Sequence, residues 1–257
     1  MIPANSNFEV RLATSATDLA ASQRLRYDVF VVELGGDGDM VDHQGRLERD
    51  RFDAHFDHLV LIDHDRKADP LEQVVGVYRL MKTDAADQLG QFYTDDEYDL
   101  SPLRATGRNL LELGRSCLHA DYRGGTAMLH LWSGLADYVQ AHEIEIMFGV
   151  ASFHGTDIQA LSGPLSFLHQ RHLAPPELRV RSRKFQNMDL IGADKLDRVA
   201  AMAATPSLIK AYLRLGGYVG EGAFVDHAFN TTDVCLVMDT QRMNERQLGI
   251  YTKKRSP

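Results

Sequence analysis

The sequence predicts an α/β fold, a mixed sheet with flanking helices, from the period and the order of its apolar runs. Runs in which apolar and polar residues alternate, typical of strands, take turns with runs of helical spacing. The first half has the order strand, helix, strand, strand, which favours antiparallel pairing. The middle has the order strand, helix, strand, helix, which favours a parallel crossover. We expect one domain over 1–257, with an N-terminal half of about 1–150 and an enlarged C-terminal half of about 151–257 that completes the sheet.

Local patterns predict the individual elements. Residues 8–12 alternate as a strand, and apolar residues recur at helical spacing from Leu25 to Val32. A glycine-rich break at 35–38 ends this helix, and the charged loop from there to Asp53 is long enough to indicate a function. The other predicted elements are strands at 58–63 and 74–81, which form an antiparallel hairpin, strands at 110–119 and 144–150, helices at 128–139, 157–172 and 206–215, and two strands flanking 229–232.

Composition excludes several classes of protein. The chain has 28 Lys and Arg against 36 Asp and Glu, a net charge of -8, so its overall field does not attract nucleic acid. No apolar run approaches the roughly 20 residues of a transmembrane helix, and the first residues lack the pattern of a signal peptide. We therefore expect a cytoplasmic protein without a transmembrane segment or a nucleic-acid partner. Cys117 and Cys235 lack the spacing of a disulfide framework or zinc site, so we interpret both as buried apolar side chains and expect no metal.

Charged residues recur in segments that are otherwise apolar, and they form the first group of candidate functional residues. An arginine or glutamate in a strand is costly to bury unless an opposite charge neutralises it, so these residues either face solvent or pair within one site. Glu112 and Arg115 would point to opposite faces of a regular strand, and a bulge at Gly114 would let both serve one cleft. The members of this group are Arg26, Phe30, Asp50, Asp53, Arg79, Glu112 and Arg115.

A second group, Arg123, Gly124, Gly125 and Thr126, lies between a predicted strand and a predicted helix. Backbone N–H groups at a glycine-rich turn and a helix N-terminus attract anions, so the phosphate of a pyrophosphate or phosphopantetheine is the expected ligand. A plain turn is the alternative interpretation.

The first group resembles a known motif set in order and spacing. The RYDVF of 26–30, the DRFD of 50–53, Arg79 in GVYRL and the ELGR of 112–115 resemble the motifs of the acyl-homoserine-lactone synthases, members of the GNAT acyltransferase superfamily. Three later segments look like those of the related N-acyltransferases of ornithine-lipid biosynthesis, so the resemblance covers nearly the whole chain. These segments are FGVASFHGTD at 148–157, YLRLGG at 212–217 and DHAFNTTD at 226–233.

The resemblance implies a GNAT-like fold and an amide-forming reaction. The donor would be a 3-hydroxyacyl thioester on the phosphopantetheine of an acyl carrier protein, held near Glu112, with no tightly bound cofactor. The acceptor would be the α-amino group of L-ornithine, and the product lyso-ornithine lipid. The superfamily's pyrophosphate signature is incomplete, because Thr126 and Met128 occupy its last two positions, which favours a carrier-bound donor over free coenzyme A. Gly36 and Gly114 replace a tryptophan and a serine of the lactone synthases, which indicates a different amine substrate.

Within this resemblance the residues receive roles from the chemistry of the reaction. The amine must lose a proton before it attacks, so we predict Glu112 as the general base, with Asp50 or Asp53 as the alternative, and Arg115 as a further catalytic residue. A rigid arginine fork suits the carboxylate of an amino acid or the 3-hydroxyl group of the donor. The predicted substrate-binding residues are Arg26, Phe30, Asp53 and Arg79.

Four basic residues stand out in this acidic chain: Arg179, Arg181, Arg183 and Lys184. The arginines alternate as one face of an extended strand, and we predict that an acidic acyl carrier protein docks there. A solvated edge strand is the alternative. The basic end at 253–255 leaves peripheral contact with anionic lipid at the inner face of the membrane open.

Three other functions remain open. The same chemistry on another amino acid, such as glutamine, is an alternative, with ornithine as the preferred acceptor. A lactone synthase that uses S-adenosylmethionine is disfavoured by Gly36 and by the C-terminal segments. A non-catalytic protein that binds acyl carrier would not need the clustered carboxylates and arginines.

Overall fold

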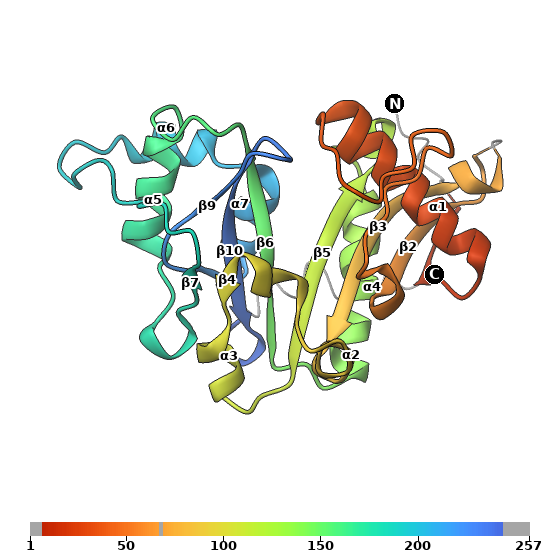
Figure 1. The fold of residues 1–257 in the computed structure, drawn as a ribbon, viewed down its shortest axis with the longest axis horizontal. Coiled ribbons are helices and arrows are strands. Elements are labelled where there is room, and N and C mark those ends of the chain that lie inside the picture. Colours follow the sequence, from red (N-terminus) through yellow and green to blue (C-terminus); the bar gives the residue numbers. More distant parts are fainter. Residues whose placement is uncertain (1–6, 67–68, 244–257) are drawn as a thin grey trace. The chain divides into compact units, whose positions relative to one another are not determined.

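The computed structural model describes residues 7–66 and 69–243, and it confirms the predicted α/β class (Figure 1). The chain forms two compact units. The first contains the described residues up to Ala85 and Leu113–Glu143, and the second contains Ala86–Glu112 and the described residues from Ile144 onward. The segment Ala86–Glu112, which the sequence analysis placed in the N-terminal half, thus belongs with the C-terminal unit.

The first unit is built on a sheet in which β1, β2 and β3 pair antiparallel and β5 is the next neighbour of β3. The predicted hairpin is therefore confirmed. The strands are β1 (Phe8–Leu12), β2 (Asp57–Asp63), β3 (Val74–Lys82) and β5 (Leu110–Leu118), whose first three residues belong to the second unit. The helices are α1 (Ala16–Arg26), the π-helix η1 (Tyr27–Glu33), α4 (Ala127–Ala141) and the 3-10 turns η2 (Asp53–His55), η3 (Pro70–Glu72) and η5 (Ala120–Tyr122); α2 (Thr83–Leu89) begins in this unit.

Alternate residues of β2 face opposite helices, so this unit has three layers. Val60 and Ile62 pack in a buried cluster with Leu25 of α1. On the other face, Leu59 lies next to Gly134 of α4. Successive side chains of a strand point to opposite faces, so an apolar β2 is buried between two helices.

Helix α1 begins with a capping box, in which the Ser15 side chain accepts from the Asp18 N–H and Asp18 accepts in return. The helix continues into the π-helix η1, where the N–H of Leu34 donates to the carbonyl of Val29 at 3.1 Å. The wider turn rotates later residues off the buried face. Val29 is buried, as the spacing predicts. Val32, which follows the wider turn, is 62% exposed.

In the second unit, β6 (Ile146–His154) and β10 (Thr231–Asp239) pair antiparallel along their length. Residues 110–112 of β5 pair in parallel with β6, which confirms the predicted crossover through α4. The short strands are β8 (Tyr218–Val219) and β9 (Phe224–Asp226), which pair with β10, and β4 (Tyr98–Asp99) and β7 (Arg181–Ser182), which pair with each other. The helices are α3 (Ser101–Ala105), α5 (Ser162–His172), α6 (Arg198–Ala204), α7 (Ser207–Arg214) and the 3-10 turns η4 (Tyr93–Asp96), η6 (Pro176–Leu178) and η7 (Thr240–Arg242).

Two predicted elements of the second unit have different limits in the structure. The helix predicted from residue 157 begins only at Ser162, because the Asp157 carboxylate accepts from the N–H groups of Gln159 and Ala160 and stabilises a turn. The extended strand predicted for 179–184 is wrong in extent, since only Arg181–Ser182 pairs as a strand. Helix α6, which is short and rich in alanine, was not predicted from the sequence.

Within residues 7–66 and 69–243, every helix is too short or too polar to span a bilayer. The basic end at 253–255, for which the sequence analysis left lipid contact open, lies outside the described residues.

Candidate active site

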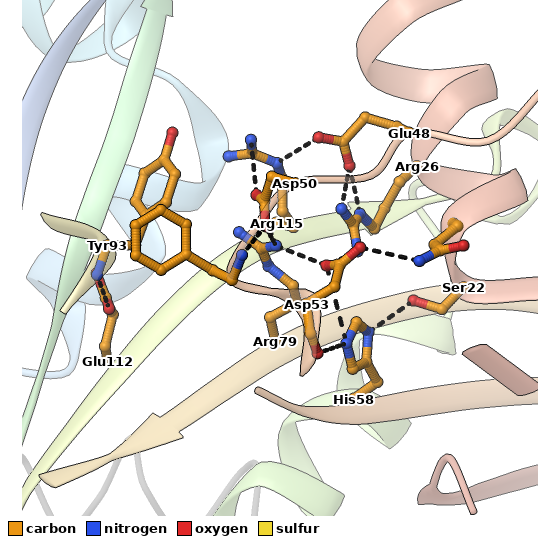
Figure 2. Close-up of polar contacts among 12 residues, drawn as sticks. Ser22, Arg26, Glu48, Asp50, Asp53, His58, Arg79, Tyr93, Glu112 and Arg115 are labelled. Atoms are coloured by element: carbon orange, nitrogen blue, oxygen red, sulfur yellow. Dashed lines mark hydrogen bonds and ion pairs between the residues drawn. The ribbon is translucent and has the colours of Figure 1, made fainter. Parts of the chain in front are cut away.

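Three arginines and three carboxylates of the first unit form one ion-pair network (Figure 2). The arginines come from α1, β3 and β5. Glu48 and Asp50 come from the loop that follows η1, and Asp53 begins η2. The structure therefore gathers most of the first group of candidate residues and adds Glu48. The members are Arg26, Arg79, Arg115, Glu48, Asp50 and Asp53.

The inner part of the network is fully buried. The side chain of Arg26 is 0% exposed; its Nε donates to Glu48 at 2.5 Å and its Nη1 donates to Asp53 Oδ1 at 2.6 Å. Nη1 of Arg79, also 0% exposed, donates to Asp53 Oδ1 and to Asp50 Oδ2, each at 2.7 Å. Gln23 Nε2 donates to the second oxygen of Asp53 at 2.9 Å. Asp53 thus bridges Arg26 and Arg79. Both buried arginines act on the site through the carboxylates that they hold.

The outer part of the network is partly exposed. The Arg115 side chain is 13% exposed and that of Asp50 is 18% exposed, against 1% for Glu48. Arg115 Nε donates to Glu48 at 3.1 Å, its Nη2 lies 3.5 Å from Asp50, and its guanidinium carbon lies 5.7 Å from the centre of the Phe30 ring. Asp50 and Arg115 are thus the members best placed to meet a ligand.

The backbone of β5 departs from regular strand geometry at Arg115, whose φ is +48°. A residue with a side chain rarely adopts this left-handed conformation, and such strain concentrates at functional sites. This conformation lies next to Gly114, where the bulge stays a prediction. It directs the Arg115 side chain toward Glu48 and Asp50.

The network is electrically balanced, because three guanidinium groups face three carboxylates. Burial raises the pKa of Glu48, but Arg115 and Arg26 outweigh burial and lower that pKa to about 2. Burial also raises the pKa of Asp53, and the positive charges of Arg26 and Arg79 lower it. The arginines have the larger effect, so the pKa of Asp53 lies well below its ordinary value. A carboxylate with so low a proton affinity is a weak base. This favours a structural part for Asp53 in the network, and its alternative role as general base stays a prediction.

His58 supports the network from β2. Its Nε2 lies 3.1 Å from the backbone carbonyl of Asp53, and its Nδ1 lies 3.1 Å from the hydroxyl of Ser22 on α1. A carbonyl only accepts, so Nε2 carries the proton and Nδ1 accepts from Ser22. Burial and the nearby Arg26 lower the pKa of His58 to about 4, so the ring is neutral at pH 7. His58 thus fixes the backbone of Asp53 to α1 without adding charge.

Glu112, the predicted general base, belongs to the second unit and is 1% exposed. Its Oε2 accepts from the N–H of Tyr93 at 2.8 Å (Figure 2). Its Oε1 accepts from the N–H and the hydroxyl of Thr94 at 2.6 and 2.5 Å. These donors fix the orientation of the carboxylate and attach β5 to the turn η4. The contacts described for Arg115 are those to Glu48 and Asp50, so the expected neutralisation of Glu112 by Arg115 stays a prediction.

The glycine turn precedes α4, as predicted, with Gly124 at a φ of +77°. The residues from Arg123 to Thr126 are exposed, and Thr126 caps the helix without a side-chain hydrogen bond. The first N–H groups of a helix have no partner within it, so this turn offers donors to an anion. The Arg123 side chain is engaged elsewhere, since it donates to the carbonyl of Leu118 and to Glu33.

The four basic residues predicted to bind the carrier protein have different surroundings. Arg179 donates to the carbonyl of Ala174, and Arg183 donates to the carbonyl of Asp95, so both hold loops of their own unit. Arg181 is exposed and pairs with Glu221, and exposed Lys184 lies over the ring of Phe224.

Glu48, Ser22 and His58 were not predicted as site residues from the sequence. A signal for Glu48 was present, because three arginines in apolar segments require three carboxylates and only Asp50 and Asp53 had been named in that loop. Nothing in the sequence distinguishes Ser22 or His58 from other helix and strand residues. The prediction for both cysteines is confirmed: Cys117 and Cys235 are buried free thiols, and burial raises the pKa of Cys117 to about 12.

Replacing Glu48 tests the charge balance. Glu48→Gln removes a buried carboxylate and leaves Arg26 without its full complement of negative charge, so we expect the free energy of unfolding to fall by about 3–5 kcal/mol. Urea denaturation measures this change. The control is Glu72→Gln, an exposed glutamate of the same unit, which should stay within about 0.5 kcal/mol of wild type. Equal stability of the two variants would contradict the balanced network.

Replacing His58 tests its protonation state. In the unfolded chain His58 has its ordinary pKa of 6.5, whereas in the folded chain its pKa is about 4. The unfolded state therefore binds the proton more tightly, and the free energy of unfolding falls as the pH drops from above 6.5 toward 4. His58→Gln keeps a donor for Asp53 but does not titrate. Between pH 7 and pH 5 we expect wild type to lose about 2 kcal/mol more than the variant. Other titrating groups are the same in both proteins, so parallel curves in urea denaturation would contradict a neutral buried His58.

Comparisons with known proteins identify the family of the chain. Residues 25–133 match the family model described as Acetyltransferase (GNAT) domain. An L-ornithine N(alpha)-acyltransferase of Rhodobacter capsulatus is 62% identical over 99% of this chain and 98% of its own. One of Brucella abortus is 39% identical over 95% of this chain and 89% of its own.

Similarity to solved structures concerns the fold alone. The CoA-dependent acyl-homoserine lactone synthase MesI matches with a TM-score of 0.52 and 14% identity over 97% of both chains. BjaI, another such synthase, matches with a TM-score of 0.50 and 15% identity over 96% of this chain and 88% of its own. These matches and the family model confirm the GNAT-like fold. On the strength of the full-length relatives, the chain belongs to the family of L-ornithine N(alpha)-acyltransferases.

Proposed function

We propose that this protein transfers a 3-hydroxyacyl group from an acyl carrier protein to the α-amino group of L-ornithine, which gives lyso-ornithine lipid. The observation that carries the proposal is the relative named L-ornithine N(alpha)-acyltransferase, 62% identical across nearly the full length of both chains. The arginine and carboxylate network supports it, because an amino-acid acceptor presents both a carboxylate and an ammonium group to be recognised.

The exposed end of the network suits the acceptor. Arg115 has a planar fork of donors that matches a carboxylate, and Asp50 beside it suits an ammonium group. Buried Arg26 and Arg79 hold the carboxylates that position Arg115 and Asp50. The ion pairs within the network hold Arg115 and Asp50 in place before the substrate binds.

Amide formation requires a neutral amine, a positioned thioester and stabilisation of the oxyanion that forms at the carbonyl. The thioester is already activated, so the protein needs no covalent nucleophile. Cys117 fits this view, since a buried thiol with a pKa raised to about 12 is not reactive at pH 7. Glu112 is our choice for the general base, held by Tyr93 and Thr94, and Asp50 is the alternative.

The donor arrives on its own prosthetic group, so we propose no tightly bound cofactor. The N–H groups of the turn from Gly124 to Thr126 would receive the phosphate of phosphopantetheine. Exposed Arg181 and Lys184 would contact the acidic carrier protein, while Arg179 and Arg183 keep the surrounding loops in place.

Thiol release from a 3-hydroxyacyl carrier protein, with mass spectrometry of the products, tests the function. We expect release with ornithine and a product mass equal to the hydroxyacyl group plus ornithine. Glutamine, lysine and S-adenosylmethionine are the comparison amines. A product only with glutamine would move the protein to another aminolipid, and a product only with S-adenosylmethionine would make it a signal synthase. No release with any amine would favour a carrier-binding role.

Charge reversal tests the docking surface. Arg181→Glu with Lys184→Glu should raise the KM for the carrier-bound donor about tenfold without changing the KM for ornithine, because only encounter with the carrier loses attraction. Lys195→Glu reverses an exposed charge of the same unit outside this surface and serves as control. Unchanged donor kinetics in the double variant would exclude these residues from docking.

A further inference from the structure

The turn proposed to receive the donor phosphate has one cationic side chain, Arg123, and this cation is paired with a carboxylate. Arg123 Nη2 donates to Glu33 Oε2 at 2.7 Å. Nε and Nη2 also donate to the carbonyl of Leu118 at 3.1 and 3.0 Å. Glu33 is the last residue of the π-helix η1, so an element distant in sequence holds the guanidinium of the turn. The pair is half-exposed, with side chains 46% and 33% exposed for Arg123 and Glu33.

Charges on the flank of the turn are balanced as well. His119 lies four residues before Arg123. Its side chain interacts electrostatically with Arg66 and with three carboxylates, Asp121, Asp28 and Glu33. Burial and the charge of Arg66 lower the pKa of His119. Asp28 in turn pairs with Arg46 at 2.5 Å. Among the described residues identified at this flank, three arginines therefore meet three carboxylates, and the turn attracts anions chiefly through its backbone N–H groups.

This balance distinguishes two donors that carry the same thioester. Phosphopantetheine on a carrier protein has a single phosphodiester, which backbone N–H groups can satisfy. Free coenzyme A has a diphosphate and a further phosphate, and such a polyanion gains most from guanidinium partners. Glu33 pairs with the guanidinium of the turn and places a negative charge beside it, which repels a polyanion.

We propose that Glu33 determines donor specificity, by pairing with Arg123 so that coenzyme A thioesters are disfavoured while carrier-bound thioesters are accepted. This inference rests on the proposed function, since it assigns the donor preference of that same site. Glu33 itself touches neither the thioester nor the amine, and it acts through Arg123 and through its charge.

The variant Glu33→Gln tests the inference with both donors. It keeps the size of the side chain and releases Arg123 from an ion pair, so kcat/KM for a 3-hydroxyacyl coenzyme A should rise about threefold to tenfold relative to the carrier-bound donor. The KM for ornithine should not change. If Glu33→Gln folds poorly by circular dichroism, Glu33→Ala removes the same charge and has the same expected result.

Two further variants separate the ion pair from general charge. Asp28→Asn removes an equal charge from the same helix but leaves the Arg123–Glu33 pair intact, so the donor ratio should match wild type. Adding Arg123→Gln to Glu33→Gln should abolish the gain with coenzyme A donors. An unchanged donor ratio in Glu33→Gln, or an equal rise in Asp28→Asn, would overturn the assignment.

Binding of unacylated coenzyme A distinguishes failure of the inference from failure of the proposed function. Isothermal calorimetry should show tighter coenzyme A binding to Glu33→Gln than to wild type by a similar factor, whatever the acceptor amine is. If wild type releases no thiol from the carrier-bound donor, the proposed function fails, and the binding result still decides the role of Glu33. Equal affinity of wild type and Glu33→Gln for coenzyme A would overturn that role.

Discussion

The balance of buried charge in the first unit is the constraint on which the rest of the site depends. Arg26 and Arg79 are fully buried, and removing a guanidinium from water costs several kcal/mol unless opposite charges compensate. One loop supplies the compensation through Glu48, Asp50 and Asp53. The course of that loop is therefore fixed by ion pairs rather than by regular secondary structure, and the loop ties α1, β3 and β5 to one another.

The network has a buried end and a partly exposed end, and the balance of charge bears on both. The pKa of Glu48 and that of Asp53 are both lowered, so these carboxylates stay charged and hold the arginines. Arg115 and Asp50 lie at the partly exposed end, which the proposed function assigns to the amino-acid acceptor. The strained φ of Arg115 is consistent with this division, because the ion pairs to Glu48 and Asp50 offset the cost of the left-handed backbone.

The fold was predictable from sequence where one pattern dominates. The hairpin of β2 and β3 and the crossover from β5 through α4 follow from apolar period and glycine breaks, and both are confirmed. Elements set by local side-chain bonds were less accessible. The turn that delays α5 depends on the Asp157 carboxylate, and the residues around Arg181 are held by contacts remote in sequence, such as the bond from Arg183 to the Asp95 carbonyl.

The site was predictable to a similar degree. Motif resemblance named the three arginines and two of the three network carboxylates, but not Glu48, since the charged loop contains many carboxylates and only the fold shows which one is buried. The neutral state of His58 depends on burial beside Arg26, which no spacing reveals. The pairing of Arg123 with Glu33, 90 positions apart, is likewise a product of the fold.

The coupling free energy between Glu48 and Arg115 tests the central claim of a balanced network most directly. Urea denaturation of Glu48→Gln, Arg115→Gln and the double variant gives this quantity. If the charges balance, the double variant restores neutrality and loses less stability than the sum of the single losses, by about 1–3 kcal/mol. Additive losses would contradict the claim, because they would mean that the two side chains stabilise the protein independently.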